Sequence, residues 1–300
     1  MKKTFLTFLC LTIALFVTDR TGGIVMQWVC RHSNDVLSPK LQYVQDGIHE
    51  DMVLMGTSRC HHHYVPSIIS DSVGITVYNA GVGGSGNIFA HYIMLCHILS
   101  RYTPKIICLD VAPTDYNQQR SPFSGTNLYS SLFGRNESAD SVYRLAESYW
   151  PYKISHLYRY NVRASSNLWG LLLNRQQDSY KGYIPLPCPE HRLSAPEFED
   201  TDQSIDSLKM EYLKRFIAEC RQRKIKLVFV ASPKYTLVDN SYYGIFRSIA
   251  DEYSIPFLDY HTSKRYQTHP ELFKDVNHLW DQGARLFSRE FSCDLKQIFH

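Results

Sequence analysis

Two short segments near opposite ends of the chain carry residues that could act together as a nucleophile and its base. Ser58 follows the apolar run 51–55, which has the character of a short buried strand. His278 has a carboxylate, Asp275, three residues before it, close enough in sequence to bond the imidazole and fix its tautomer. The order Ser58, Asp275, His278 predicts a catalytic triad, with the serine at a strand end, where open α/β sheets bind ligands.

The elements that must position these residues alternate along the chain. Apolar runs of strand character cover 53–57, 75–78, 105–111, 226–231 and 257–258. Helical spacing of apolar residues covers 88–102, 207–223, 241–253 and 281–298. Near-continuous apolar strands joined by helices are typical of a parallel sheet covered on both faces. The sequence therefore predicts an α/β fold, a three-layer αβα sandwich with a central parallel sheet of flavodoxin-like type.

The stretch from about 113 to 205 departs from this alternation. It is rich in Tyr, Ser, Asn and Arg, and we expect it to be an insertion after the third strand that lies over the mouth of the site. Aromatic side chains offer flat apolar faces with polar tips, which suit sugar rings. The candidates are Tyr149, Trp150, Tyr152 and Trp169, at least half of which we expect in the core of the insertion. The alternative is a subdomain that only packs.

The amino terminus has the character of a targeting segment. Lys2 and Lys3 precede thirteen mostly apolar residues, Phe5 to Val17, which end at a polar and glycine-containing stretch. This length is short for a span of roughly 20 residues, and it is typical of a secretory signal. No small-x-small cleavage site follows, so an uncleaved anchor is an equal alternative. We expect residues 1–30 to be this signal or anchor, with the lysines in the cytoplasm and residues 31–300 outside the cytoplasmic membrane or secreted.

Composition excludes several classes of function. The chain has 300 residues, 44% hydrophobic and 20% charged, which suits one large α/β domain and argues against disorder. A net charge of +3, evenly spread, argues against a nucleic-acid partner. The eight cysteines have no CxxC spacing, and His61, His62 and His63 are consecutive, so their side chains cannot readily converge on one ion. We expect no metal and no cofactor.

The glycine-rich run 79–84 has two interpretations. A loop of this kind could cradle a phosphate before a helix. A dinucleotide fingerprint, however, follows the first strand of its unit, and this run follows the second. Nucleotide binding is therefore the weaker interpretation.

Four blocks in order along the chain resemble those of the SGNH, or GDSL-like, hydrolases. They are Gly56-Thr57-Ser58, Asn79-Ala80-Gly81-Val82-Gly83-Gly84, Ala112-Pro113-Thr114-Asp115 and Asp275-Val276-Asn277-His278. The resemblance implies that Ser58 attacks an ester carbonyl, His278 activates it and Asp275 orients the histidine. It further implies an oxyanion hole formed by the amide of Ser58, the amide of Gly84 and the side chain at position 114.

Two blocks depart from the family pattern. Thr114 stands where the family usually has Asn, and its hydroxyl has a shorter reach than a carboxamide. Thr57 and Arg59 flank the serine, and the form Gly-x-Ser-Arg resembles a membrane-anchored branch that works beside membrane-bound O-acyltransferases on cell-surface polysaccharides. Arg59 and Asn79, which belong to these blocks, join Trp150 and Trp169 as candidate substrate-binding residues.

Two hypotheses for function follow. The first is a serine esterase or O-acyltransferase that acts on acyl esters, with acetyl the expected group, of a cell-surface carbohydrate through an acyl-serine. The second is a catalytically weak or inactive partner of this fold in a membrane complex for polysaccharide modification, with a membrane-bound O-acyltransferase as its partner. The departure at Thr114 supports the second hypothesis, whereas Ser58, Asp275 and His278 support the first.

Overall fold

A five-stranded parallel sheet forms the centre of the computed structural model, which describes residues 1–84, 86–118, 123, 125–172, 181–191, 193–199 and 204–299. The strands are β1 (Met52–Met55), β2 (Val77–Asn79), β3 (Ile106–Asp110), β4 (Lys226–Ala231) and β5 (Phe257–Asp259). Their order is β2-β1-β3-β4-β5, and every neighbouring pair is parallel. This is the flavodoxin-like order of a doubly wound sheet, as the sequence predicted.

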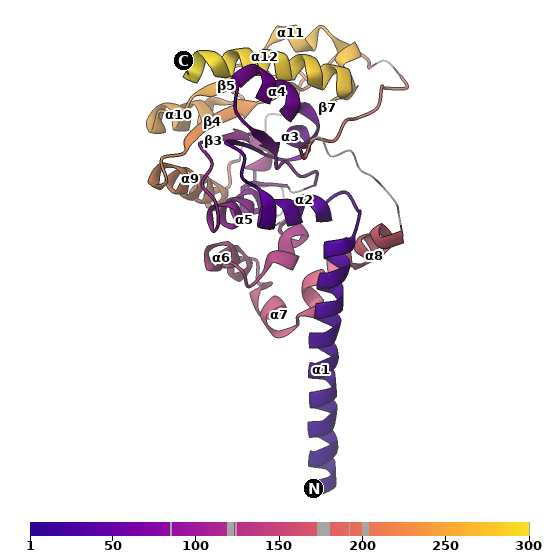
Figure 1. Cartoon of the computed structure of the whole chain (residues 1–300). Coiled ribbons are helices and arrows are strands. Elements are labelled where there is room, and N and C mark those ends of the chain that lie inside the picture. Colours follow the sequence, from indigo (N-terminus) through magenta and orange to yellow (C-terminus); the bar gives the residue numbers. More distant parts are fainter. Residues whose placement is uncertain are drawn as a thin grey trace.

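Helices cover both faces of the sheet (Figure 1). One face packs on α5 (Ile88–Leu99), α9 (Ser207–Gln222) and α10 (Gly244–Tyr253). The other packs on α3 (Ser58–His63), α4 (Pro66–Val73) and α12 (Asp281–Phe299). Successive strand residues alternate between the two cores: Val53 and Met55 belong to the first, Met52 and Leu54 to the second. Both faces are therefore buried, which explains why the strands are continuous apolar runs.

The smaller elements complete the fold. Ahead of the sheet lie α2 (Ser38–Gln42) and a short π-helix, η1 (Tyr43–Gly47). After β5 come α11 (Lys264–Gln267), the 3₁₀ helix η5 (Pro270–Leu272) and the antiparallel pair β6 (Phe273–Asp275) and β7 (His278–Leu279). The turn between β6 and β7 is the segment that holds Asp275 and His278.

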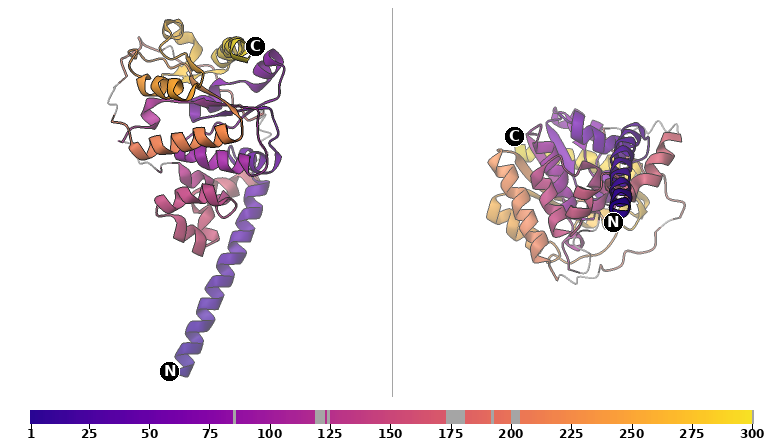
Figure 2. Two further views of the ribbon diagram at one scale, coloured as in Figure 1. Left: turned by 90° about the vertical axis from the view of Figure 1, so that its left-hand side faces the viewer. Right: turned by 90° about the horizontal axis from the view of Figure 1, so that it is seen from below.

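The insertion is mostly helical. It begins at the 3₁₀ helix η2 (Pro113–Asp115) and continues as η3 (Thr126–Leu132), α6 (Glu137–Leu145), α7 (Tyr149–Ile154), η4 (Leu157–Arg163) and α8 (Ala164–Leu172). Figure 1 shows α6 and α7 below α5 and α8 beside the first helix, and the left view of Figure 2 again shows this part of the insertion below the sheet. α6 packs against α5, whereas η4 and α8 pack against the first helix.

The first helix, α1 (Lys2–His32), is longer than the sequence suggested. The polar and glycine-containing stretch at 18–23 was expected to end the apolar segment, but the helix runs through it without interruption. Gly23 allows the insertion to pack directly on this helix: a Cβ there would lie 2.6 Å from the Cβ of His156. The N-terminal half projects from the body with its apolar side chains exposed. Among the described residues, α1 is the helix long and apolar enough to cross a membrane.

Candidate active site

Ser58 and His278 meet at the carboxyl edge of the sheet. Ser58 is the first residue of α3, directly after the loop that leaves β1. Its Oγ lies 2.7 Å from Nε2 of His278, although 220 residues separate them in sequence. The structure thus brings together the two groups that the sequence pairs as nucleophile and base.

Gly56 fixes the turn that leads to the serine. A Cβ at this position would lie 2.7 Å from the Cβ of Cys60 and 2.9 Å from that of Asp110. No side chain fits in this space, so the loop can pass close to the ends of both α3 and β3 only with glycine here. The close packing holds the start of α3, and with it Ser58, against the sheet edge.

Asp275 holds the opposite side of the imidazole. Its two carboxylate oxygens lie 2.9 and 3.0 Å from Nδ1 of His278. The same carboxylate accepts the backbone N–H groups of Asn277, at 2.8 Å, and His278, at 3.0 Å, which closes the β6–β7 turn. Burial raises the pKa of Asp275, but the hydrogen bonds from His278 and Asn277 outweigh it, and the pKa lies below its ordinary value. An ionised Asp275 favours the His278 tautomer whose Nε2 is free to accept a proton.

The three consecutive histidines take three separate directions. His61 Nδ1 lies 2.7 Å from the carbonyl oxygen of Gly81, and His62 Nδ1 lies 2.8 Å from that of Ile184. His63 Nε2 accepts the N–H of Leu279 at 3.0 Å. His61 and His63 are buried, whereas His62 is partly exposed. The ring centroid of His62 lies 5.7 Å from that of His278. Burial lowers the pKa of His62 to about 4, so it is uncharged at neutral pH and adds no repulsion to a protonated His278.

The two remaining candidate oxyanion donors lie on loops beside Ser58. The loop that carries Gly84 runs alongside the β1 loop, where the N–H of Val82 donates to the carbonyl of Gly56 at 3.1 Å. Thr114 lies in η2, which directly follows β3, the other neighbour of β1. Both candidates therefore leave strands adjacent to the one that carries the nucleophile. Their role as oxyanion donors stays a prediction.

Arg59 and Asn79, which the sequence suggested as substrate-binding residues, are both buried, and their side chains bond to other parts of the protein. Asn79 is fully buried, and its amide donates to the carbonyls of Cys60 at 2.6 Å and Tyr64 at 3.0 Å. Its Oδ1 accepts the N–H of Gly81 at 2.9 Å. The side chain thus ties α3 to the glycine-rich loop, and its hydrogen-bonding groups are occupied by the protein.

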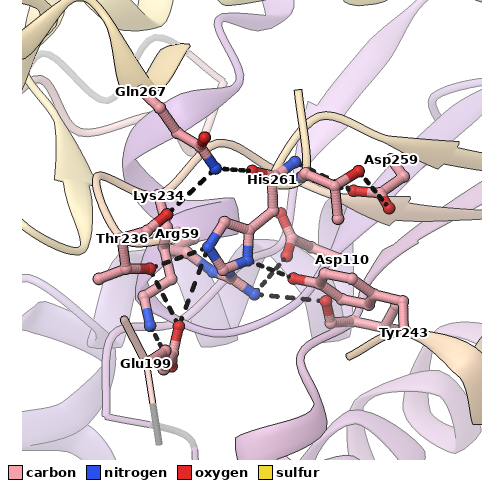
Figure 3. Close-up of polar contacts among 11 residues, drawn as sticks. Arg59, Asp110, Glu199, Lys234, Thr236, Tyr243, Asp259, His261 and Gln267 are labelled. Carbon is pink, nitrogen blue, oxygen red and sulfur yellow. Dashed lines mark hydrogen bonds and ion pairs between the residues drawn. The ribbon is translucent and has the colours of Figure 1, made fainter. Parts of the chain in front are cut away.

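Arg59 follows Ser58 by one residue, so its side chain leaves the helix on a different face and enters a buried polar cluster (Figure 3). Its guanidinium lies 3.2 Å from the carboxylate of Asp110. Burial lowers the pKa of Arg59, but Asp110, Tyr243 and Asp115 together raise it more, so the guanidinium stays protonated. The cluster continues through Tyr243 to His261, whose Nδ1 lies 2.9 Å from the tyrosine hydroxyl. Neighbours in sequence therefore point to different places, which a motif alone does not reveal.

The aromatic helices of the insertion also lie elsewhere. Trp150 is on α7 and Trp169 on α8, and these helices pack on α6, η4 and α1. Tyr152 belongs to the insertion core, and Tyr149 is half-buried against it. Besides η2, the returning segment 181–186 of the insertion lies near the site, where it accepts hydrogen bonds from Asn79 and His62.

Sequence reasoning missed Lys40, a buried residue of α2. Its Nζ lies 2.5 Å from the carbonyl oxygen of Gly81 and 3.1 Å from Nδ1 of His61. Lys40 and Asn79 therefore both hold the glycine-rich loop through the backbone of Gly81. Burial lowers the pKa of this lysine from 10.5 to about 7. A lysine in a short polar helix gives no signal in the sequence that it is buried.

Comparisons with known proteins give distant similarities to solved structures, among them the following two. No family model and no curated protein matches the chain. A solved structure of a candidate lipolytic protein of the G-D-S-L family from Desulfitobacterium hafniense has 13% identity and a TM-score of 0.42, covering 81% of this chain and 98% of its own. A candidate acylhydrolase from Bacteroides fragilis has 10% identity and a TM-score of 0.42, covering 88% and 97%. Because both similarities are this distant, the functional argument rests on the geometry of the site.

Proposed function

We propose that this protein is a serine ester hydrolase or acyltransferase that works through an acyl-serine intermediate. The observation that carries the proposal is the chain of contacts from Ser58 Oγ to His278 Nε2, at 2.7 Å, and from His278 Nδ1 to Asp275, at 2.9 Å. A hydroxyl is a weak nucleophile until a base takes its proton, and this arrangement supplies an oriented base at hydrogen-bond distance.

The reaction proceeds in two steps. Ser58 Oγ attacks the ester carbonyl carbon while its proton moves to His278 Nε2, and the carbonyl oxygen becomes an oxyanion facing the amides of Ser58 and Gly84 and the hydroxyl of Thr114. Collapse breaks the bond to the alcohol, which takes the proton from Nε2 and leaves the acyl group on Ser58. Water or a sugar hydroxyl then attacks the acyl carbon and loses its proton to His278 Nε2. The bond between the acyl carbon and Ser58 Oγ breaks, and Ser58 Oγ takes the proton back from Nε2.

The anchor supports a place for this chemistry outside the cytoplasmic membrane. Lys2 and Lys3 precede the exposed apolar half of α1, which fits a helix with its amino terminus in the cytoplasm. The C-terminal half of α1 packs on the insertion and buries Met26 and Val29. Cleavage inside α1 would remove part of this packing, which favours an uncleaved anchor over a secreted form. A carbohydrate ester at the cell surface, with acetyl as its acyl group, is the substrate class that we propose first.

Acyl loading of Ser58 tests the proposal. The full-length chain is incubated with p-nitrophenyl acetate, and the site of acetylation is located by mass spectrometry of its peptides. We expect acetyl on the peptide that contains Ser58, and loss of both the adduct and p-nitrophenol release in Ser58→Ala and His278→Ala. Ser67→Ala, which alters an exposed serine on the neighbouring α4, is the matched control and should behave as the natural chain. Undiminished turnover in Ser58→Ala would refute the proposal.

The second candidate function is the non-catalytic partner in a complex with a membrane-bound O-acyltransferase. The threonine at position 114, in place of a longer carboxamide, is the observation that favours it. It predicts that neither the small ester nor an acetylated polysaccharide acylates Ser58. Detection of acetyl-Ser58 with either substrate would dismiss this candidate.

A further inference from the structure

The insertion is bound to α1 at one level of that helix. The Asp19 carboxylate accepts the backbone N–H groups of His156, at 2.9 Å, and Leu157, at 3.2 Å, together with the hydroxyl of Ser155. The next residue, Arg20, donates to the carbonyl oxygen of Ile154 at 3.1 Å. These contacts fix the junction of α7 and η4 beside residues 19 and 20 of the anchor.

That level lies close to the expected outer boundary of a bilayer, within about one helical turn. The hydrocarbon core is about 30 Å thick and takes about 20 residues of helix at 1.5 Å each. Counted from Lys3, whose ammonium would lie at the inner boundary, the outer boundary falls near Gly22 and Gly23. The typical tilt of about 20° shortens the span along the membrane normal by only a few per cent. Asp19 and Arg20 then lie within about one helical turn of that boundary, on its inner side, and the end of α7 lies beside them.

The side chains exposed on α7 and at the start of η4 suit that environment. Trp150 is 64% exposed and Ile154 is 68% exposed, and Leu157 and Tyr158 are also exposed. Lys153 extends over Trp150, with its Nζ 5.5 Å from the ring centroid. Aromatic and aliphatic groups with cations at their edge are the composition found where helices meet lipid headgroups. Exposed to water, these apolar groups would form an unfavourable surface patch, and such patches mark sites of interaction.

We propose that α7 and the first residues of η4, through Trp150, Ile154, Leu157 and Tyr158, form a lipid-contacting face that is seated in the outer headgroup layer of the bilayer. This inference rests on the anchor of the proposed function and goes beyond it. A single spanning helix would leave the domain free to swing, whereas a second contact with the bilayer fixes its orientation. The sheet edge with Ser58 is then held at a constant height above the membrane.

Trp169 provides a matched control within the same chain. It is 63% exposed, nearly the same as Trp150. Its neighbour Gly170 accepts the N–H of Asn34 through its carbonyl at 3.1 Å, beyond the end of α1. The helix rises about 21 Å between Asp19 and Ser33 at 1.5 Å per residue, so Trp169 lies well outside the headgroup layer. Trp28 is on α1, between Asp19 and the end of the helix.

Fluorescence quenching tests the placement. The full-length chain, which has four tryptophans, is reconstituted into phosphatidylcholine vesicles containing lipids brominated near the headgroup end of the acyl chain. We expect the bromolipid to quench part of the emission, Trp150→Phe to remove most of that quenching, and Trp169→Phe to leave it unchanged. Iodide in the outer solution should show the opposite pattern, with Trp169 accessible and Trp150 protected.

The outcomes separate this inference from the proposed function. If the chain floats with the vesicles but Trp150→Phe and Trp169→Phe alter bromolipid quenching equally, or neither alters it, the lipid-contacting face is wrong while the anchor stands. If the chain does not float with the vesicles, both the anchor and the face are wrong. Turnover of p-nitrophenyl acetate in the same samples reports on Ser58 independently, because neither tryptophan belongs to the active site.

Discussion

The imidazole of His63 accepts the backbone N–H of Leu279 at 3.0 Å, and this bond joins the helix of the nucleophile to the segment of the base. Ser58 begins α3 and His63 ends it, while His278 immediately precedes Leu279. Burial lowers the pKa of His63 well below its ordinary value, so the ring is neutral and its Nε2 is available as an acceptor. The separation of Ser58 and His278 is thus set by a direct link within the fold.

His63→Ala is expected to lower kcat for p-nitrophenyl acetate by roughly 10- to 100-fold with little change in KM, because a small displacement of His278 impairs proton transfer more than binding. His63→Gln, whose amide oxygen can accept the same N–H, should recover part of the loss. His49→Ala removes an exposed histidine and serves as the control. An unchanged kcat in His63→Ala would show that the link does not position the base.

Asp275→Asn is expected to lower kcat by about 10²- to 10⁴-fold. The amide oxygen can still accept the N–H groups of Asn277 and His278, so the turn should persist. The amide nitrogen, however, donates to Nδ1 of His278 and selects the tautomer with the proton on Nε2, which cannot accept the Ser58 proton. Steady-state kinetics, with the exposed Asp251→Asn as control, measure the effect. A loss of less than threefold would show that the carboxylate is not the orienting group.

Thr114 is expected to donate its hydroxyl to the oxyanion. Thr114→Val preserves the shape and removes the donor, and loss of one such donor costs roughly 10²–10³ in kcat. Thr114→Ser keeps the hydroxyl and should retain most of the activity. Equal kcat values for the valine and serine variants would remove Thr114 from the oxyanion hole.

The sheet was predictable because its strands are buried on both faces. The run Lys226–Ala231 was predicted with the bounds that the structure has, and the longer helices α5, α9, α10 and α12 were predicted to within a few residues. The short helices α3 and α4, which also pack on the sheet, were not predicted. Here local apolar pattern and tertiary burial agree. The pairing of Ser58 with His278 was expected from the motifs and from the rule that parallel strands end at one edge.

Side-chain direction and long-range contact were not predictable in the same way. Arg59 adjoins Ser58 in sequence, yet it points into a buried cluster because adjacent helix residues leave on different faces. The glycines at 22 and 23 suggested the end of a helix, but they allow the insertion to approach α1 closely. Trp150 and Trp169 suggested a sugar platform because composition does not show which surface a helix covers.

Because Lys40 is buried, it makes the free energy of unfolding depend on pH. Its pKa falls from 10.5 in the unfolded chain to about 7 in the folded one. Between these values the unfolded state binds the extra proton, so the free energy of unfolding rises with pH, by at most about 1.4 kcal/mol per pH unit from this group. Below pH 7 the full cost of burial is present, and above 10.5 it is gone.

Lys40→Met removes this contribution and keeps an apolar chain in the space. Its lost hydrogen bond to Gly81 lowers stability equally at every pH, so the diagnostic quantity is the slope and not the absolute value. The measurement is urea unfolding of the detergent-solubilised full-length chain between pH 7 and 9.5. Over this range the free energy of unfolding of the natural chain should rise relative to that of Lys40→Met by up to about 3 kcal/mol. Lys105→Met, which alters an exposed lysine paired with Asp51, should follow the natural profile. Parallel profiles for the natural chain and Lys40→Met would mean that the buried amine does not titrate in this range.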